Sequence, residues 1–215
     1  MSIMASILDS FFKNQVRVGE YECPCGSVKC ELKIPASSYV LIDQVTAMCH
    51  CDDCVGFCKA CPNGEYVIDN HSTHMVNFYK SDIVVTQGQD KIKGIRLTDC
   101  APFVRMYCED CGTPLGAEVM RPPFILLYPK LITKGPKYVP TTIFGRKWAP
   151  PEARPYVGIP TRDNVYGVFF ILKLLGRAFL GVLLGKFGPA MLNNTDAYSS
   201  IPIGISSIQT IKKKE

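Results

Sequence analysis

Cysteine is the residue that most constrains this 215-residue chain, because most of its eleven cysteines fall into three short clusters. The clusters are Cys23–Gly26, Cys49–Cys54 and Cys108–Gly112. An odd number of cysteines argues against a complete disulfide framework, and Met1–Lys13 lacks the pattern of a secretory signal. We therefore expect a protein that is not secreted and that occupies an intracellular reducing compartment, either the cytoplasm or the interior of an organelle. Thiols in such a compartment act as metal ligands, nucleophiles or small core residues.

The outer two clusters have the composition of a structural zinc site. Cys23 and Cys25 form one short-spaced pair, and Cys108 and Cys111 form the other. Together they supply the four thiolates that a structural zinc ion binds in a tetrahedron. Each pair is followed directly by a glycine, which can adopt the positive φ of a tight ligand turn.

The middle cluster offers three sulfur ligands within six residues, at Cys49, Cys51 and Cys54. Three protein ligands leave a fourth position open for water or substrate, which is typical of a catalytic zinc site. The alternative is a closed structural site in which a nearby side chain supplies the fourth ligand. The candidates for that ligand are His50, Cys58 and Cys61.

Short β-rich segments separated by turn residues predict a mainly β fold with an antiparallel sheet. No helical segments alternate with these strands, which argues against a βαβ fold. The expected strands begin near Tyr21 and cover Val28–Ile34, Ser38–Val45, Val67–Ile68, Met75–Tyr79, Ile83–Thr86, Ile92–Leu97, Phe103–Tyr107, Leu115–Met120 and Phe124–Tyr128.

The order of the three cysteine clusters resembles that of a known family. Cys23–Val28 reads Cys-x-Cys-Gly-x-Val, Cys49–Cys54 reads Cys-x-Cys-x-x-Cys, and Arg105–Leu115 contains Tyr-Cys-x-x-Cys-Gly-Thr-Pro-Leu. This series resembles the glutathione-dependent formaldehyde-activating (GFA) domain, which is shared with centromere protein V. The resemblance covers roughly residues 18–130.

The resemblance implies a Mss4-like zinc-binding β fold with two Zn²⁺ ions per chain. By position, the outer four cysteines would bind the structural zinc, and Cys49, Cys51 and Cys54 would bind the catalytic zinc. The family is associated with carbon–sulfur lyase chemistry, which joins or separates formaldehyde and glutathione as S-hydroxymethylglutathione. A thiol small molecule similar to glutathione is therefore the expected substrate.

Two other functions remain open. The domain could be a non-catalytic, zinc-stapled structural subunit of a larger and possibly membrane-bound assembly. It could also be a microtubule or chromatin binder, as the resemblance to centromere protein V implies. Charge argues against a nucleic-acid partner, because the formal net charge of +5 falls to +2 once seven thiolates and two Zn²⁺ ions are included.

The chain is expected to divide into five segments. They are an N-terminal helical segment (1–17, with a helix at Ser6–Lys13), the GFA-like zinc domain (18–130), a proline-rich extended connection (131–163), an apolar helix (164–192) and a polar and basic tail (193–215).

The apolar helix is the part that the family resemblance does not explain. Residues 168–187 are long enough to span a bilayer, but Lys173 and Arg177 near the centre bring the expected insertion free energy close to zero. Gly181 and Gly185 form a small-xxx-small step that permits a close helix contact. The helix could pack on another protein, associate with a membrane, or fold back on its own domain. We expect a protein partner or a membrane to bind through residues 164–192.

Overall fold

The computed structural model describes residues 16–35, 45–98, 101–119, 123–153, 168–183, 185–186 and 191. The predicted helix at Ser6–Lys13 and the predicted tail at 193–215 lie outside these residues. The described chain is mainly β, as the sequence predicts, with two α-helices and several 3-10 turns. The turns are η1 (Gly64–Tyr66), η2 (Lys80–Asp82), η3 (Gln89–Lys91), η4 (Pro129–Leu131) and η5 (Arg146–Trp148).

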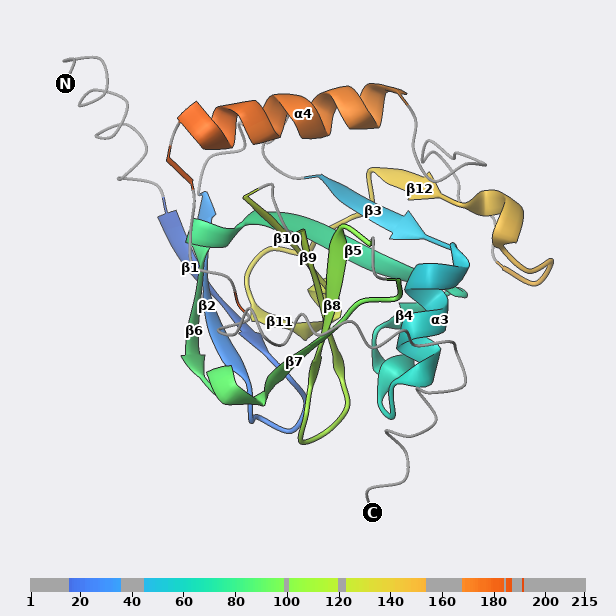
Figure 1. Cartoon of the computed structure of the whole chain (residues 1–215), viewed down its shortest axis with the longest axis horizontal. Coiled ribbons are helices and arrows are strands. Elements are labelled where there is room, and N and C mark those ends of the chain that lie inside the picture. The colour runs from blue at the N-terminus through green and yellow to red at the C-terminus, as the bar shows by residue number, and fades with distance from the viewer. Residues whose placement is uncertain are drawn as a thin grey trace.

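Two β-sheets form the body of the protein (Figure 1). The smaller sheet has the strand order β11 (Ile132–Lys134), β1 (Val16–Glu22), β2 (Lys29–Pro35) and β6 (Ile83–Gln87). The larger sheet has the order β12 (Thr142–Phe144), β3 (Thr46–Cys49), β5 (Ser72–Tyr79), β10 (Phe124–Leu127), β9 (Pro114–Val119), β8 (Phe103–Cys108) and β7 (Ile92–Ile95), and β4 (Ile68–Asp69) pairs with β5. Among the described strands, only β12 and β3 pair in parallel.

The two sheets share one hydrophobic core. Tyr21 and Leu32 from the smaller sheet are buried in the same cluster as Met106, Ile125 and Leu127 from the larger sheet. The Tyr21 hydroxyl donates a hydrogen bond to the Leu115 carbonyl, which links the two sheets directly. Because each sheet buries one face against the other, the turns that connect the strands meet at the edges of this core, where the cysteine clusters lie.

The sequence analysis does not predict the helix α3 (Asp52–Ala60), which begins inside the middle cysteine cluster. The sequence contains weak signals for this helix, in the charged residues at its two ends. Asp52 and Asp53 occupy the first turn and Lys59 occupies the last turn, as the helix dipole favours. The helix is only nine residues long and contains Gly56, which lowers its intrinsic helix propensity. Tertiary packing therefore stabilises it, with Val55, Phe57 and Cys58 buried.

The proline-rich segment at 131–163 contributes strands to both sheets. β11 pairs with β1, and β12 extends the larger sheet beside β3. The described part of this segment is therefore more ordered than a loose connection. Its second strand ends next to the middle cysteine cluster, because the backbone N–H of His50 donates to the carbonyl of Phe144 at 3.0 Å.

The apolar helix α4 (Val168–Leu183) folds back along one side of the larger sheet (Figure 1). Arg177 is 3% exposed, and its Nε donates to Asn77 Oδ1 at 2.9 Å. The Tyr79 hydroxyl donates to the Arg177 carbonyl at 3.0 Å. The sequence leaves open whether the helix packs on another protein, on a membrane or on its own domain. The structure shows that the face with Arg177 packs on its own domain.

The two glycines of the small-xxx-small step have roles within this chain: one permits a close contact with β5, and the other ends the helix. A Cβ atom on Gly181 would lie 2.6 Å from the Tyr79 ring, so glycine permits this close contact between α4 and β5. Gly185 has a φ of +62° and ends the helix. Lys186 follows it, and its backbone N–H donates to the Gly181 carbonyl at 2.8 Å. No helix among the described residues is long and apolar enough to cross a membrane.

His74 on β5 makes the stability of the fold depend on pH. Burial lowers the pKa of its ring from 6.5 to about 4, and Nε2 lies 2.6 Å from Thr46 Oγ1. The unfolded chain then binds a proton more readily than the folded chain between these two values, so stability falls as the pH drops from 6.5 towards 4. At one pKa unit per 1.36 kcal/mol, the loss is at most about 3 kcal/mol.

We expect His74→Gln to unfold less steeply with acid than the unchanged protein between pH 6.5 and 4. Urea unfolding at several pH values measures this difference. Parallel pH dependence in the two proteins would show that His74 does not carry the effect.

Candidate metal centres

The outer cysteine pairs meet in space, although they lie far apart in the chain. The sulfur atoms of Cys23, Cys25, Cys108 and Cys111 all lie within 4.8 Å of one another. We call this group the tetrad. The Sγ of Cys108 lies 3.8 Å from the Sγ of both Cys23 and Cys25. Four sulfurs at the usual zinc–sulfur distance would be about 3.8 Å apart, so the geometry fits a tetrahedral thiolate site.

The tetrad is built from two β-turns, one from each sheet. Cys23 and Cys25 lie in the turn between β1 and β2, and Cys108 ends β8 just before the turn to β9. Gly26 and Gly112 adopt the positive φ values of +74° and +66° that these ligand turns require, as the sequence predicts. A metal bound here would cross-link the two sheets at one edge of the core.

The middle cluster brings together Cys49, Cys51 and Cys54, whose sulfur atoms also lie within 4.8 Å of one another. We call this group the triad. Cys49 ends β3, while Cys51 and Cys54 frame the start of α3. Their backbone is fixed by the helix, because the Cys51 carbonyl accepts hydrogen bonds from the N–H groups of Cys54 and Val55 at 3.1 Å. Cys49 is buried, and the other two are partly exposed.

The residues proposed to close the triad lie elsewhere. Cys58 Sγ donates to the Tyr128 hydroxyl at 3.3 Å, and Cys61 is buried in the main hydrophobic core. His50 Nδ1 donates to the His71 carbonyl at 2.9 Å. In the part of the chain that the structure describes, the group of side chains that could bind a metal at this position contains three residues.

Arg105 is the functional candidate that the sequence analysis misses. The sequence predicts only that it lies in the strand Phe103–Tyr107, but its side chain is 7% exposed and its Nη2 lies 3.8 Å from Cys54 Sγ. A permanently charged guanidinium buried beside a thiol stabilises the thiolate form. The sequence shows only a charge between the apolar residues Val104 and Met106, and the burial of this strand and the partner Cys54 are seen in the fold alone.

Each cysteine group contains one thiol that ionises readily. Hydrogen bonds from Cys49 and Cys51, together with the Arg105 guanidinium, hold the pKa of Cys54 well below its usual range. Burial acts against ionisation of Cys25, but hydrogen bonds from Ser27, Cys111 and Cys23 together outweigh it and lower the pKa of Cys25 to about 6. The pKa values of Cys23, Cys49, Cys51 and Cys108 are raised, so Cys25 and Cys54 are the thiols whose ionisation is favoured. Burial also raises the pKa of Cys58, which lies outside both groups, to about 12, and Cys58 is an inert core residue.

A tryptophan lies at the edge of the triad. A Cβ on Gly145 would lie 2.8 Å from the Trp148 ring and 3.1 Å from the backbone nitrogen of Cys51, so the ring and the triad loop are close neighbours. Lys147 Nζ lies 4.2 Å from the centre of the Trp148 ring. Trp148 is the only tryptophan of the chain, and its fluorescence therefore reports on this region alone.

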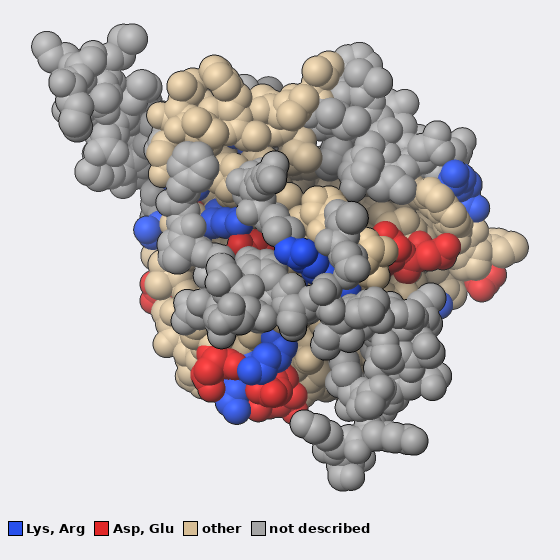
Figure 2. Space-filling view, viewed as in Figure 1, with Lys and Arg blue, Asp and Glu red and all other residues tan. Residues whose placement is uncertain are grey.

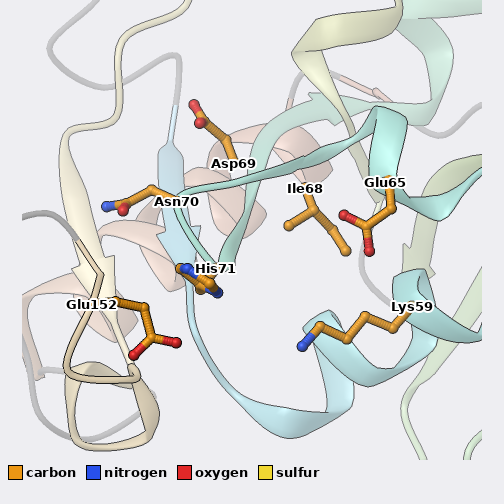
Figure 3. Close-up of a pocket in the computed structure, with 7 residues that line it drawn as sticks. All are labelled: Lys59, Glu65, Ile68, Asp69, Asn70, His71 and Glu152. Atoms are coloured by element: carbon orange, nitrogen blue, oxygen red, sulfur yellow. The ribbon is translucent and has the colours of Figure 1, made fainter.

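A cavity of about 580 Å³ lies beside the loop that carries His71 (Figure 3). It is connected to the triad through the hydrogen bond from His50 to His71, one of its lining residues. Carboxylates from Glu65, Asp69 and Glu152 surround it, and Lys59 reaches towards it from α3. None of the cysteines that the structure describes lines the cavity, so it is separate from both cysteine groups.

We expect Arg105→Met to weaken metal binding at the triad by roughly tenfold, because the Cys54 thiolate loses its buried cationic partner. Binding at the tetrad should not change. Competition of Co²⁺-loaded protein with a chelator measures the two affinities separately. Arg105→Lys should retain most of the affinity, and Lys33→Met on the exposed face of β2 is the charge-matched control. Equal affinities in all three variants would remove Arg105 from the site.

The comparisons with known proteins give a family without a function. A model described as a family of unknown function (DUF6151) matches residues 15–200, and no curated protein matches the chain. Among solved structures, the chain is similar to a Rhodobacter sphaeroides protein, the crystal structure of a structural genomics target. The two share 12% sequence identity with a TM-score of 0.40, over 66% of this chain and 99% of that chain. Because the family match includes both cysteine groups and α4, the chain belongs to DUF6151, a family of unknown function.

Proposed function

We propose that the protein is a zinc enzyme that forms or cleaves the carbon–sulfur bond of a thiol–aldehyde adduct similar to S-hydroxymethylglutathione. The observation that carries the proposal is the difference between the two cysteine groups, one with four sulfur atoms and one with three. Four thiolates complete a tetrahedral zinc site, whereas three leave a position for a substrate sulfur or oxygen. The motif order shared with the GFA domain supports the same assignment.

Zinc is the metal that best fits these ligands. Both groups consist of cysteine alone among the described residues, and soft thiolate ligands select zinc over the hard cations calcium and magnesium. The tetrad would hold a structural ion. Cys49, Cys51 and Cys54 would hold the second ion, and zinc bound there would stabilise a substrate thiolate and polarise an aldehyde oxygen.

The reaction needs no oxidant or reductant. In the forward direction the thiol sulfur attacks the carbonyl carbon of formaldehyde, a carbon–sulfur bond forms, and the carbon–oxygen double bond becomes a single bond. The proton lost by the thiol ends on the new hydroxyl oxygen. Arg105 acts beside this centre, because its positive charge balances the net negative charge that three thiolates and one Zn²⁺ would create. The anionic sulfur of a substrate can therefore approach this centre at a lower electrostatic cost.

The test is the rate at which the adduct exchanges with free formaldehyde and glutathione, measured by NMR exchange spectroscopy with ¹³C-labelled formaldehyde. The zinc-loaded protein should accelerate exchange more than tenfold over buffer. Cys54→Ser should abolish the acceleration while the tetrad keeps its metal, and Cys58→Ser is the matched control outside the triad. A fully zinc-loaded protein that leaves the exchange rate at the buffer value would overturn the proposal and favour a structural subunit.

A further inference from the structure

The face of α4 that points away from the domain is apolar. Its large side chains are 52–66% exposed, and Figure 2 shows an uncharged surface over this helix. The exposed residues are Leu172, Leu175, Phe179, Val182 and Leu183. Leu172, Leu175, Phe179 and Val182 are spaced three or four residues apart, and Leu183 lies four residues after Phe179, so the five form one continuous stripe along the helix. We call it the α4 stripe.

The orientation of α4 is the reverse of that in an ordinary surface helix. Arg177 points inward and is buried against Asn77 and Tyr79, while leucine and phenylalanine point outward. The contact of Gly181 with Tyr79 and the ion pair of Lys186 with Asp82 at 2.9 Å hold the helix in this orientation. An exposed apolar stripe of this length is typical of a surface that another molecule covers.

The shape of the α4 stripe indicates which molecule covers it. Gly176 lies in the middle of the stripe, between Leu172 and Phe179, and apart from its chain neighbours and the backbone of its own helix no atom lies within 4 Å of the position that its Cβ would occupy. This leaves a notch beside a large projecting ring. If a second α4 packs antiparallel, with the two-fold axis midway between residues 176 and 179, Phe179 of each copy fills the notch at Gly176 of the other. The same axis brings Leu172 opposite Leu183.

The charge distribution fits the same partner. The five exposed residues and Gly176 carry no charge, so two identical stripes can meet without repulsion between like charges. A two-fold interface requires a patch that is complementary to itself, and a large residue next to a small one meets this condition. We propose that α4 pairs antiparallel with α4 of a second copy of this chain, through the α4 stripe. The proposal does not depend on the chemistry at the cysteine groups.

The oligomeric state of the full-length protein tests this, measured by sedimentation equilibrium across a range of concentrations. The unchanged protein should dimerise with a dissociation constant on the order of micromolar, as expected for a small apolar interface. Phe179→Asp should abolish dimerisation. Val18→Asp, at an exposed valine on β1, is the matched control and should leave it intact.

Gly176→Leu separates a second copy from a lipid surface. Replacing glycine by leucine strengthens the helix and meets no atom within the domain, so the fold is retained. Filling the notch should weaken dimerisation roughly tenfold or more, because Phe179 of the partner copy no longer fits. A lipid-binding stripe would behave in the opposite way, since the added side chain would increase binding to phosphatidylcholine and phosphatidylserine vesicles.

The exchanged variant Gly176→Phe with Phe179→Gly places the ring and the notch at each other's positions and should restore dimerisation. Circular dichroism and a cooperative thermal unfolding transition confirm that each variant is folded. A protein that stays monomeric at all concentrations would overturn the proposal. Tighter dimerisation or stronger vesicle binding by Gly176→Leu would overturn it as well.

Discussion

Cys108→Ser is expected to lose one bound metal ion per chain and to destabilise the whole fold. The reason is that Cys108 Sγ is 3.8 Å from both Cys23 and Cys25, so the tetrad cross-links the two sheets through this residue. A structural thiolate site contributes its binding free energy directly to folding, and we expect a loss of about 5 kcal/mol or more. Elemental analysis and thermal unfolding measure the two effects.

The control for this prediction is Cys30→Ser. Cys30 is equally buried, but it belongs to the hydrophobic core and to neither cysteine group. It should keep the full metal content and lose only about 1–3 kcal/mol, as expected when a buried apolar site receives a hydroxyl. Similar melting temperatures for the Cys108 variant and the unchanged protein would contradict a structural role for the tetrad.

Arg177→Met is expected to release α4 from the larger sheet. The substitution removes hydrogen bonds to Asn77 and the stacking of the guanidinium 4.3 Å above the Tyr79 ring. Buried hydrogen bonds to charged groups and cation–π contacts together stabilise this docking by about 4 kcal/mol. Methionine has a similar length and is a good helix former, so the helix itself is not disfavoured.

Limited proteolysis measures the release of α4. The Arg177→Met protein should be cleaved in the 154–186 region at least tenfold faster than the unchanged protein, while its metal content stays constant. Lys173→Met, in the same helix but not buried, is the matched control. If both variants resist the protease equally, the buried arginine does not anchor the helix.

The fold class and the cysteine groups could be predicted because their signals are local. The strands at Met75–Tyr79 and Phe103–Tyr107 show β-rich composition between turn residues, and the structure contains both. The cysteine pairs are spaced at two or three residues, so each pair must share one turn wherever it lies in the fold. The structure brings the expected sulfur atoms together, and their role as zinc ligands stays a prediction.

The features that could not be predicted depend on distant contacts. Helix α3 has weak intrinsic propensity and depends on the burial of Phe57 and Cys58. Strand β12 pairs with β3 across about ninety residues of chain, and nothing in its three residues indicates that partner. The role of Arg105 depends on Cys54, which reaches it only after α3 and β8 are in place. Local composition contains none of these pairings.

The placement of the apolar helix α4 could not be predicted from its sequence either. Its sequence left three partners open, because a stripe of leucine and phenylalanine suits a protein, a membrane or the helix's own domain. The structure shows that Arg177 and Gly181 pack on the domain and that the stripe remains exposed. One face of the helix therefore packs on the domain and the other face is exposed. The amino-acid composition of the helix alone does not show which residues lie on which face.

The measurement that tests the central claim most directly is X-ray absorption at the zinc edge of the fully loaded protein. One tetrad and one triad predict two zinc ions per chain with about 3.5 sulfur neighbours each on average, at about 2.3 Å, and one light ligand, which belongs to the zinc at the triad. Cys54→Ser should raise the average to about four for the single ion that remains. Four sulfur neighbours at both sites of the unchanged protein, or disulfides without a bound ion, would contradict the account.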